Sequence, residues 1–110
     1  MNIQIFMGKK NFDCQKAERW FKERRIKFQA VDVDKFGMSR GELRSSAQCI
    51  GLMNMVNEKA PGAELLQYLS PPSAVEDKLF EDGRLIKTPI VRNGKKATVG
   101  YCPDVWATWE

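Results

Sequence analysis

The sequence predicts an α/β protein with a four-stranded mixed sheet and a helical insertion. Three observations carry this prediction. Residues 2–33 read as strand, amphipathic helix and strand, the middle of the chain is rich in helix formers and proline, and two alternating stretches near the C-terminus meet at Asn93-Gly94. A chain of 110 residues is long enough to bury a core without disulfides or metals, so one domain spanning 1–110 is expected.

The first unit is predicted from its two periodicities. NIQIF (2–6) alternates polar and apolar residues, as a short strand does, and a helix over 12–25 follows with apolar residues at helical spacing. Asn11 is expected to cap this helix, because its side-chain oxygen can accept a backbone N–H of the first turn. KFQAVDV (27–33) alternates again. A strand, helix and strand joined by short connections predict two parallel strands.

The middle of the chain reads as helices. Ser39 is a good cap for a polar helix over 40–49, and the segment 51–82 reads as further short helices. The double proline Pro71-Pro72 cannot lie inside a helix, so it divides this segment.

The C-terminal part predicts a hairpin and a last helix. LIKTPIV (85–91) and KATVGY (96–101) read as antiparallel strands, with Asn93-Gly94 as the central turn residues, which both need a positive φ. Pro103 is then expected to open a short helix that contains VWATW (105–109).

Composition excludes several classes of site. The chain has three cysteines, with no CxxC pair, and no histidine. Reduced thiols are therefore expected, and no disulfide framework or zinc cage. Without histidine there is no Ser-His or Cys-His nucleophile pair and no histidine-bound metal.

Charge and hydropathy indicate a mildly basic, water-exposed surface. The net charge is +4, but the lysines and arginines alternate with acids, so direct binding of nucleic acid is not expected. No apolar run reaches the roughly 18 residues of a membrane span, and the first residues lack the pattern of a signal peptide. A cytoplasmic protein that does not insert into membranes is predicted.

Three blocks in this order carry a resemblance to a known family: GKKNFDCQKAERWFKERRI, GMSRGELR and TPIVRNGKKATVGYCPD. They are similar to the arsenate-reductase-related (ArsC) family, which includes the Spx-type regulators that bind RNA polymerase. The resemblance implies a thioredoxin-like fold of the glutaredoxin type. It also implies that Thr88 and Pro89 form a loop with a cis-proline beside the first helix.

The resemblance also defines a catalytic pattern from which this chain departs. The family uses a cysteine at the helix N-terminus, where free N–H groups stabilise a thiolate, together with arginines that hold an oxyanion. The family's nucleophilic cysteine corresponds to Asn11 here, and two of its arginines correspond to Thr88 and Cys102. Arg44 matches the remaining arginine. Arsenate reduction by the family mechanism is therefore not expected.

Cys14 and Cys102 are the candidate catalytic thiols. At about 100° per residue, Cys14 lies within roughly 20° of Phe21 around the helix, so it is expected to face the core, where burial raises a thiol pKa. Cys102 precedes Pro103 and is a candidate cap of the last helix, where free N–H groups lower a thiol pKa. Cys49 is expected to be a packed small side chain.

A candidate anion site combines the first helix with nearby basic residues. Asn11, Lys10, Arg44 and Arg92 are its predicted members, with glutathione as a co-substrate or an oxyanion as the ligand. No other cofactor and no metal are expected. Two functions stay open: a glutathione-linked thiol oxidoreductase, or a non-enzymatic Spx-like module that binds a protein partner such as RNA polymerase, with Trp106 or Trp109 exposed for docking.

Overall fold

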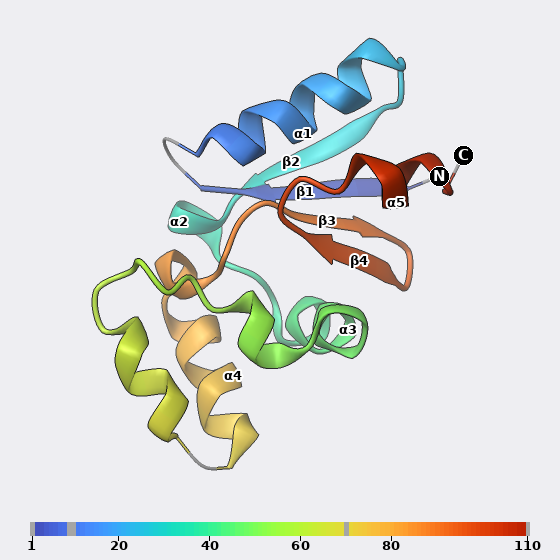
Figure 1. Cartoon of the computed structure of the whole chain (residues 1–110). Helices are drawn as coiled ribbons and strands as arrows, with labels where there is room; N and C mark the ends of the chain where they lie inside the picture. Colours follow the sequence, from blue (N-terminus) through green and yellow to red (C-terminus); the bar gives the residue numbers. More distant parts are fainter. Residues whose placement is uncertain (1, 9–10, 70, 110) are drawn as a thin grey trace.

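The computed structural model describes residues 2–8, 11–69 and 71–109. A four-stranded sheet in the order β2-β1-β3-β4 runs through the middle of the molecule (Figure 1). β1 and β2 are parallel, whereas β3 is antiparallel to both β1 and β4. The strands are β1 (Ile3–Met7), β2 (Phe28–Asp32), β3 (Ile90–Asn93) and β4 (Lys96–Val99). The predicted mixed sheet is confirmed.

Helices lie on both sides of this sheet (Figure 1). On one side are α1 (Phe12–Glu23) and α5 (Pro103–Ala107). The other side carries the helical insertion and the turns that flank it. These elements are α2 (Val33–Phe36), α3 (Arg40–Ile50), η1 (Leu52–Met55), η2 (Ala63–Tyr68), α4 (Pro72–Glu81) and η3 (Gly83–Leu85). The insertion is therefore helical, as the sequence predicts.

The alternation of the strands creates two hydrophobic clusters, one on each face of the sheet. In β1, Ile5 packs with Phe21 and Trp106 on the side of α1 and α5. Its neighbour Phe6 belongs to the opposite cluster, with Leu43 of α3. Successive side chains of a strand point to opposite faces, so a five-residue strand contributes to both cores.

The ends of α1 and α3 follow from local sequence. Asn11 caps α1 as predicted, and α1 ends earlier than residue 25, with Arg25 in the left-handed region at φ 56°. Ser39 caps α3 in a reciprocal capping box with Glu42. Each cap supplies acceptors for N–H groups that the helix itself cannot pair.

The hairpin is confirmed, but its turn differs from the prediction. Asn93 pairs with Lys96, so the two turn residues are Gly94 and Lys95 instead of Asn93 and Gly94. Only Gly94 has a positive φ, at 60°. A glycine at the first central position is the pattern of a type II′ turn.

The strand predicted over 85–91 begins later than expected. Leu85 ends the η3 turn, and the sheet starts at Ile90 after Pro89, which has no N–H to donate. The segment between them pairs instead with the region after η1. Lys87 N–H donates to the carbonyl of Met55 at 2.7 Å, and Asn57 N–H donates to the carbonyl of Leu85 at 2.7 Å. This pairing places residues 57–59 beside Thr88.

Among the described residues, no helix has the length and hydropathy needed to cross a membrane.

Gly83 is required where η3 packs against the main chain of α2. A Cβ atom built on Gly83 would lie 1.8 Å from the carbonyl oxygen of Val33. Because main chain cannot move aside as a flexible side chain does, Gly83→Ala is expected to destabilise the fold by about 1–3 kcal/mol or more. Urea unfolding measures this loss. Gly41→Ala is the matched control, because no atom lies within 4 Å of its Cβ position. The control should leave stability unchanged or slightly higher, and equal effects of the two substitutions would contradict the prediction.

Candidate functional site

Asn11 joins the start of α1 to the loop before β3. Its Oδ1 accepts the backbone N–H groups of Asp13 at 2.9 Å and Cys14 at 3.3 Å. Its Nδ2 donates to the carbonyl oxygen and to the hydroxyl of Thr88, both at 3.0 Å. The amide thus uses its acceptor on the helix and its donor on the loop. Glutamine carries the same amide but is one methylene longer.

Thr88 and Pro89 complete this junction. The Thr88-Pro89 peptide bond is cis, as the family resemblance implies. The Thr88 hydroxyl also lies against the other side of the loop, because a Cβ on Gly8 would approach it to 3.0 Å. Gly8, Asn11 and Thr88 are therefore packed so closely that a larger side chain at Gly8 would separate them.

Cys14 faces inward, as predicted from its helical angle. Its side chain is buried at 4% exposure. Burial raises the pKa of the Cys14 thiol above the ordinary 9.0, although contacts with the Gly8 main chain and the Thr88 side chain act in the opposite direction. The protonated thiol is thus the stable form at neutral pH.

Cys102 does not cap α5 with its side chain. Its thiol donates to the carbonyl of Val99 at 3.3 Å, and no side-chain cap bond is formed at this helix start. Burial raises the pKa of Cys102 as well, against a smaller opposite effect of the Thr98 side chain. The lowered pKa expected for Cys102 is therefore wrong, because the last helix has only five residues and the thiol turns back toward β4.

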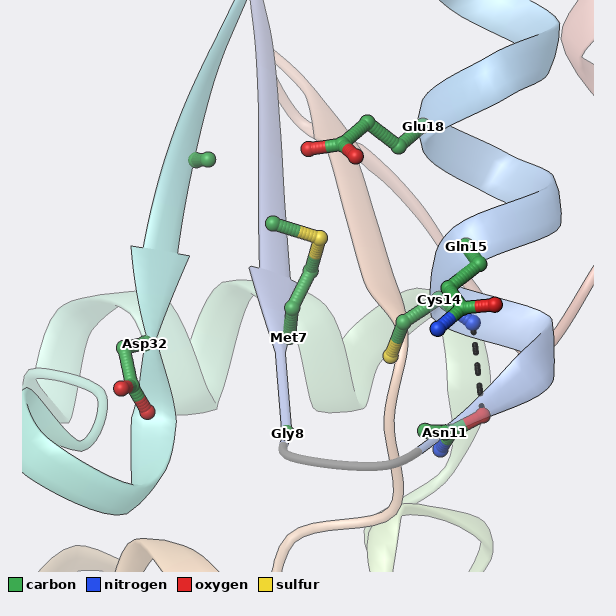
Figure 2. Close-up of a pocket in the computed structure, with 8 residues that line it drawn as sticks. Met7, Gly8, Asn11, Cys14, Gln15, Glu18 and Asp32 are labelled. Atoms are coloured by element: carbon green, nitrogen blue, oxygen red, sulfur yellow. Dashed lines mark hydrogen bonds between the residues drawn. The ribbon is translucent and has the colours of Figure 1, made fainter.

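Two cavities open at the N-terminal end of α1. The first, of about 330 Å³, lies between α1 and the two parallel strands (Figure 2). The sulfur of Cys14 and that of Met7 both point into it, and the carboxylates of Glu18 and Asp32 lie on its two sides. Cys14 is thus the one predicted thiol that borders a cavity beside Asn11.

The second cavity, of about 510 Å³, lies on the other side of Asn11. Thr88 and Asn57 line it together with two lysines, Lys59 and Lys87. Phe12 stands at its rim and is 78% exposed. These residues were missed by sequence reasoning, because the pairing between residues 55–57 and 85–87 that assembles them has no local signal.

The predicted anion-binding arginines are not at this site. The Arg44 guanidinium donates to Glu76 of α4 at 3.0 Å, and it holds the pKa of that carboxyl below its usual range together with Arg40. Arg92 donates to Gln4 of β1 at 3.0 Å and lies 3.9 Å from Glu42 of α3. The prediction that Arg44 and Arg92 belong to an anion site beside Asn11 is therefore wrong. Both arginines are bound to partners on the insertion side of the sheet.

The remaining predicted residues are Lys10 and Cys49. Lys10 lies outside the described residues. Cys49 was expected to be packed, but it is exposed on α3 and its thiol donates to the carbonyl of Lys95 at 3.0 Å. All three cysteines are free, as predicted, and Cys14 and Cys102 border different cavities. Within the ranges 2–8, 11–69 and 71–109, no group of three or more His, Cys, Asp or Glu residues is placed to hold a metal ion.

No known family model matches this sequence. A Bacillus subtilis protein with the name "Uncharacterized protein YusI" is 27% identical over 112 residues, which cover 94% of this chain and 94% of that protein.

Comparison with solved structures shows which fold the chain has. A putative ArsC family related protein from Bacteroides fragilis superposes with a TM-score of 0.84, at 21% identity over 100% of both chains. Arsenate reductase from Vibrio cholerae superposes with a TM-score of 0.83, at 22% identity over 98% of this chain and 97% of that one. The glutaredoxin-like protein NrdH-redoxin from Escherichia coli is more distant, with a TM-score of 0.51 at 16% identity over 100% of this chain and 96% of that one.

The chain has the thioredoxin-like fold of the arsenate-reductase-related proteins. The predicted fold class and the resemblance in fold are thus confirmed. In this arsenate-reductase-related fold, Asn11 stands at the start of the first helix and Thr88-Pro89 lies beside it.

The two halves of the Asn11 side chain can be separated by substitution. Asn11→Ala removes the cap and the Thr88 bond, and is expected to destabilise the protein by about 1–3 kcal/mol. Asn11→Ser keeps a capping oxygen but is too short to donate to Thr88, so its loss should be smaller, at about 0.5–1.5 kcal/mol. Thermal and urea unfolding of both variants measure the difference. Equal stability of the alanine variant and the wild type would contradict the role given to Asn11.

The raised pKa of Cys14 gives a testable pH dependence. The unfolded chain loses this proton near the ordinary pKa of 9.0, whereas the folded chain keeps it to higher pH. The contribution to stability is therefore complete below pH 9.0 and is lost as pH rises through the folded-state pKa. The free energy of unfolding of Cys14→Ala should fall less steeply than that of the wild type between about pH 8 and pH 10. Cys102→Ala should also reduce the slope, and an unchanged slope in Cys14→Ala would contradict the burial argument.

Proposed function

We propose that this chain is a non-catalytic member of the arsenate-reductase-related proteins, which acts by binding a protein partner and not by reducing arsenate. The observation that carries this proposal is the occupation of the helix start by Asn11. A thiolate nucleophile needs the N–H groups of the first turn as partners. Here Oδ1 of Asn11 already accepts two of them.

The other parts of a reductase site support the same conclusion. Cys14 is buried with a raised pKa, and thiol chemistry requires the thiolate. Arg44 and Arg92 are bound to acidic or amide partners elsewhere. A site without a thiolate and without an oxyanion clamp lacks the two groups that bring arsenate and sulfur together.

The proposed binding does not use the predicted tryptophans. Trp106 is fully buried and donates to the Thr98 hydroxyl at 2.8 Å. Trp109 is half-buried against the cluster around α1. The Spx-like hypothesis from the sequence used Trp106 or Trp109 for docking. Because neither side chain is exposed, the proposed partner binds through another surface.

A second candidate function is thiol–disulfide exchange at Cys14. It is favoured by the cavity of about 330 Å³ into which the Cys14 sulfur points. In this reaction, a Cys14 thiolate attacks a sulfur of oxidised glutathione, a mixed disulfide forms, and one glutathione thiolate leaves. The raised pKa makes this reaction slow at neutral pH.

Alkylation across pH distinguishes these functions. In the wild type, iodoacetamide followed by mass spectrometry should show Cys49 reacting first, because it is exposed, and Cys14 and Cys102 reacting slowly at about pH 7. Asn11→Cys is the positive control, because it places a thiol at the N-terminus of a 12-residue helix. That thiol should react at about pH 7 at least tenfold faster than Cys14. Rapid alkylation or glutathionylation of wild-type Cys14 at neutral pH would overturn the non-catalytic proposal.

A further inference from the structure

We propose that the outer edge of β4 binds an extended, acidic segment of a partner protein as an additional strand. This inference rests on the proposed binding function and specifies its surface and its partner. The surface, called here the β4 groove, is a cavity of about 490 Å³ on the side of β4 away from β3. Its walls include Ile50, Met53 and Val105, and Ala97 lies in the strand itself.

The register shows which backbone groups face the groove. Gly100 N–H donates to the carbonyl of Pro89 at 2.9 Å, which makes these two residues a hydrogen-bonded pair of the antiparallel ladder. Such pairs alternate with non-hydrogen-bonded pairs along two strands. Ala97, which is opposite Arg92, and Val99, which is opposite Ile90, are therefore non-hydrogen-bonded pairs with β3. Their N–H and C=O groups point away from β3, toward the open edge.

Two thiols hold the ends of this edge. Cys49 donates to the carbonyl of Lys95 at 3.0 Å, and Cys102 donates to the carbonyl of Val99 at 3.3 Å. A thiol is a weak donor, so the N–H groups of an added peptide would form stronger bonds to the same carbonyls. Between the thiols, no residue in the described part of the chain pairs with the outward N–H and C=O of Ala97. A peptide residue opposite Ala97 can therefore exchange two hydrogen bonds with it.

The walls of the groove suit alternate side chains of such a strand. Met53 is 49% exposed and Val105 is 44% exposed, one on the side of the insertion and one on α5. Exposed apolar side chains on both sides of an open strand give pockets for the side chains of an added strand, while the backbone supplies the hydrogen bonds.

Charge identifies the partner. Lys95 and Lys96 are exposed at the turn end of β4, and Lys87 lines the groove at the end where Val99 lies. The acid in the lining is Glu58. The excess of lysine favours an acidic peptide. A second copy of this chain would bring the same lysines to the joint edge, and edge lysines oppose such self-pairing.

The probe for this surface is the peptide Glu-Val-Glu-Val-Glu with blocked ends, compared with Lys-Val-Lys-Val-Lys. In an NMR titration of the full chain, the acidic peptide should shift the backbone amides of Ala97 and Val99, and the lysine peptide should not. The acidic peptide should also slow alkylation of Cys49, because it covers the groove.

Two variants test the two halves of the argument. Lys96→Glu should weaken binding of the acidic peptide about threefold or more, whereas Lys27→Glu, an exposed lysine before β2, changes the net charge equally and should leave the affinity unchanged. Ala97→Pro removes only an N–H that points away from β3, so the sheet is retained and the affinity should fall about tenfold. If Ala97→Pro fails to fold, the lysine pair alone decides the test.

The inference is overturned if both peptides bind equally, if the shifts are confined to Asn11 and Thr88, or if Lys96→Glu and Lys27→Glu behave alike. These results are independent of the thiol titration. A reactive Cys14 would remove the non-catalytic function without changing the peptide map. A failed peptide titration would remove the β4 site without changing the slow alkylation of Cys14.

Discussion

The structure around α1 depends on the four hydrogen bonds of Asn11. Two of them satisfy the helix start, and two fasten Thr88 beside it. A cysteine at this position could offer only one weak donor or one charged acceptor, and it would leave Thr88 without a donor partner. An amide at this position accepts the N–H groups with an uncharged oxygen, whereas a thiolate there would accept them with a charged, nucleophilic sulfur.

The two arginines predicted for the anion site make structural contacts away from Asn11. Arg44 joins α3 to α4 through Glu76, and Arg92 joins β3 to β1 through Gln4. Arg92 also lies 3.9 Å from Glu42 of α3, so it links the sheet to the insertion. Within the described part of the chain, Lys59 and Lys87 line a cavity with Asn11, and the pairing of residues 55–57 with residues 85–87 brings them there.

Sequence reasoning succeeds where local rules decide and fails where distant packing decides. The Asn11 cap and the inward position of Cys14 follow from one helix and its angles, and both are confirmed. The hairpin was predicted, but its turn moved by one residue because pairing of Asn93 with Lys96 fixes the register. The partner of Arg44 is 32 residues away, and Trp106 is buried by α1 and β4. No local pattern contains that information.

The outer edge of β4 suits the proposed acidic partner better than the other surfaces considered. The acids Glu18 and Asp32 line the cavity between α1 and the parallel strands, so that cavity does not suit an acidic peptide. Beside β4 lie Lys87 and the lysines of the turn. β2 is also bound to its neighbour in parallel, and parallel pairing has slanted, slightly less stable bonds. β4 continues an antiparallel ladder whose outward groups are held only by thiols. A fold whose first helix is capped by an amide thus keeps, at β4, the basic edge on which the proposed partner binding rests.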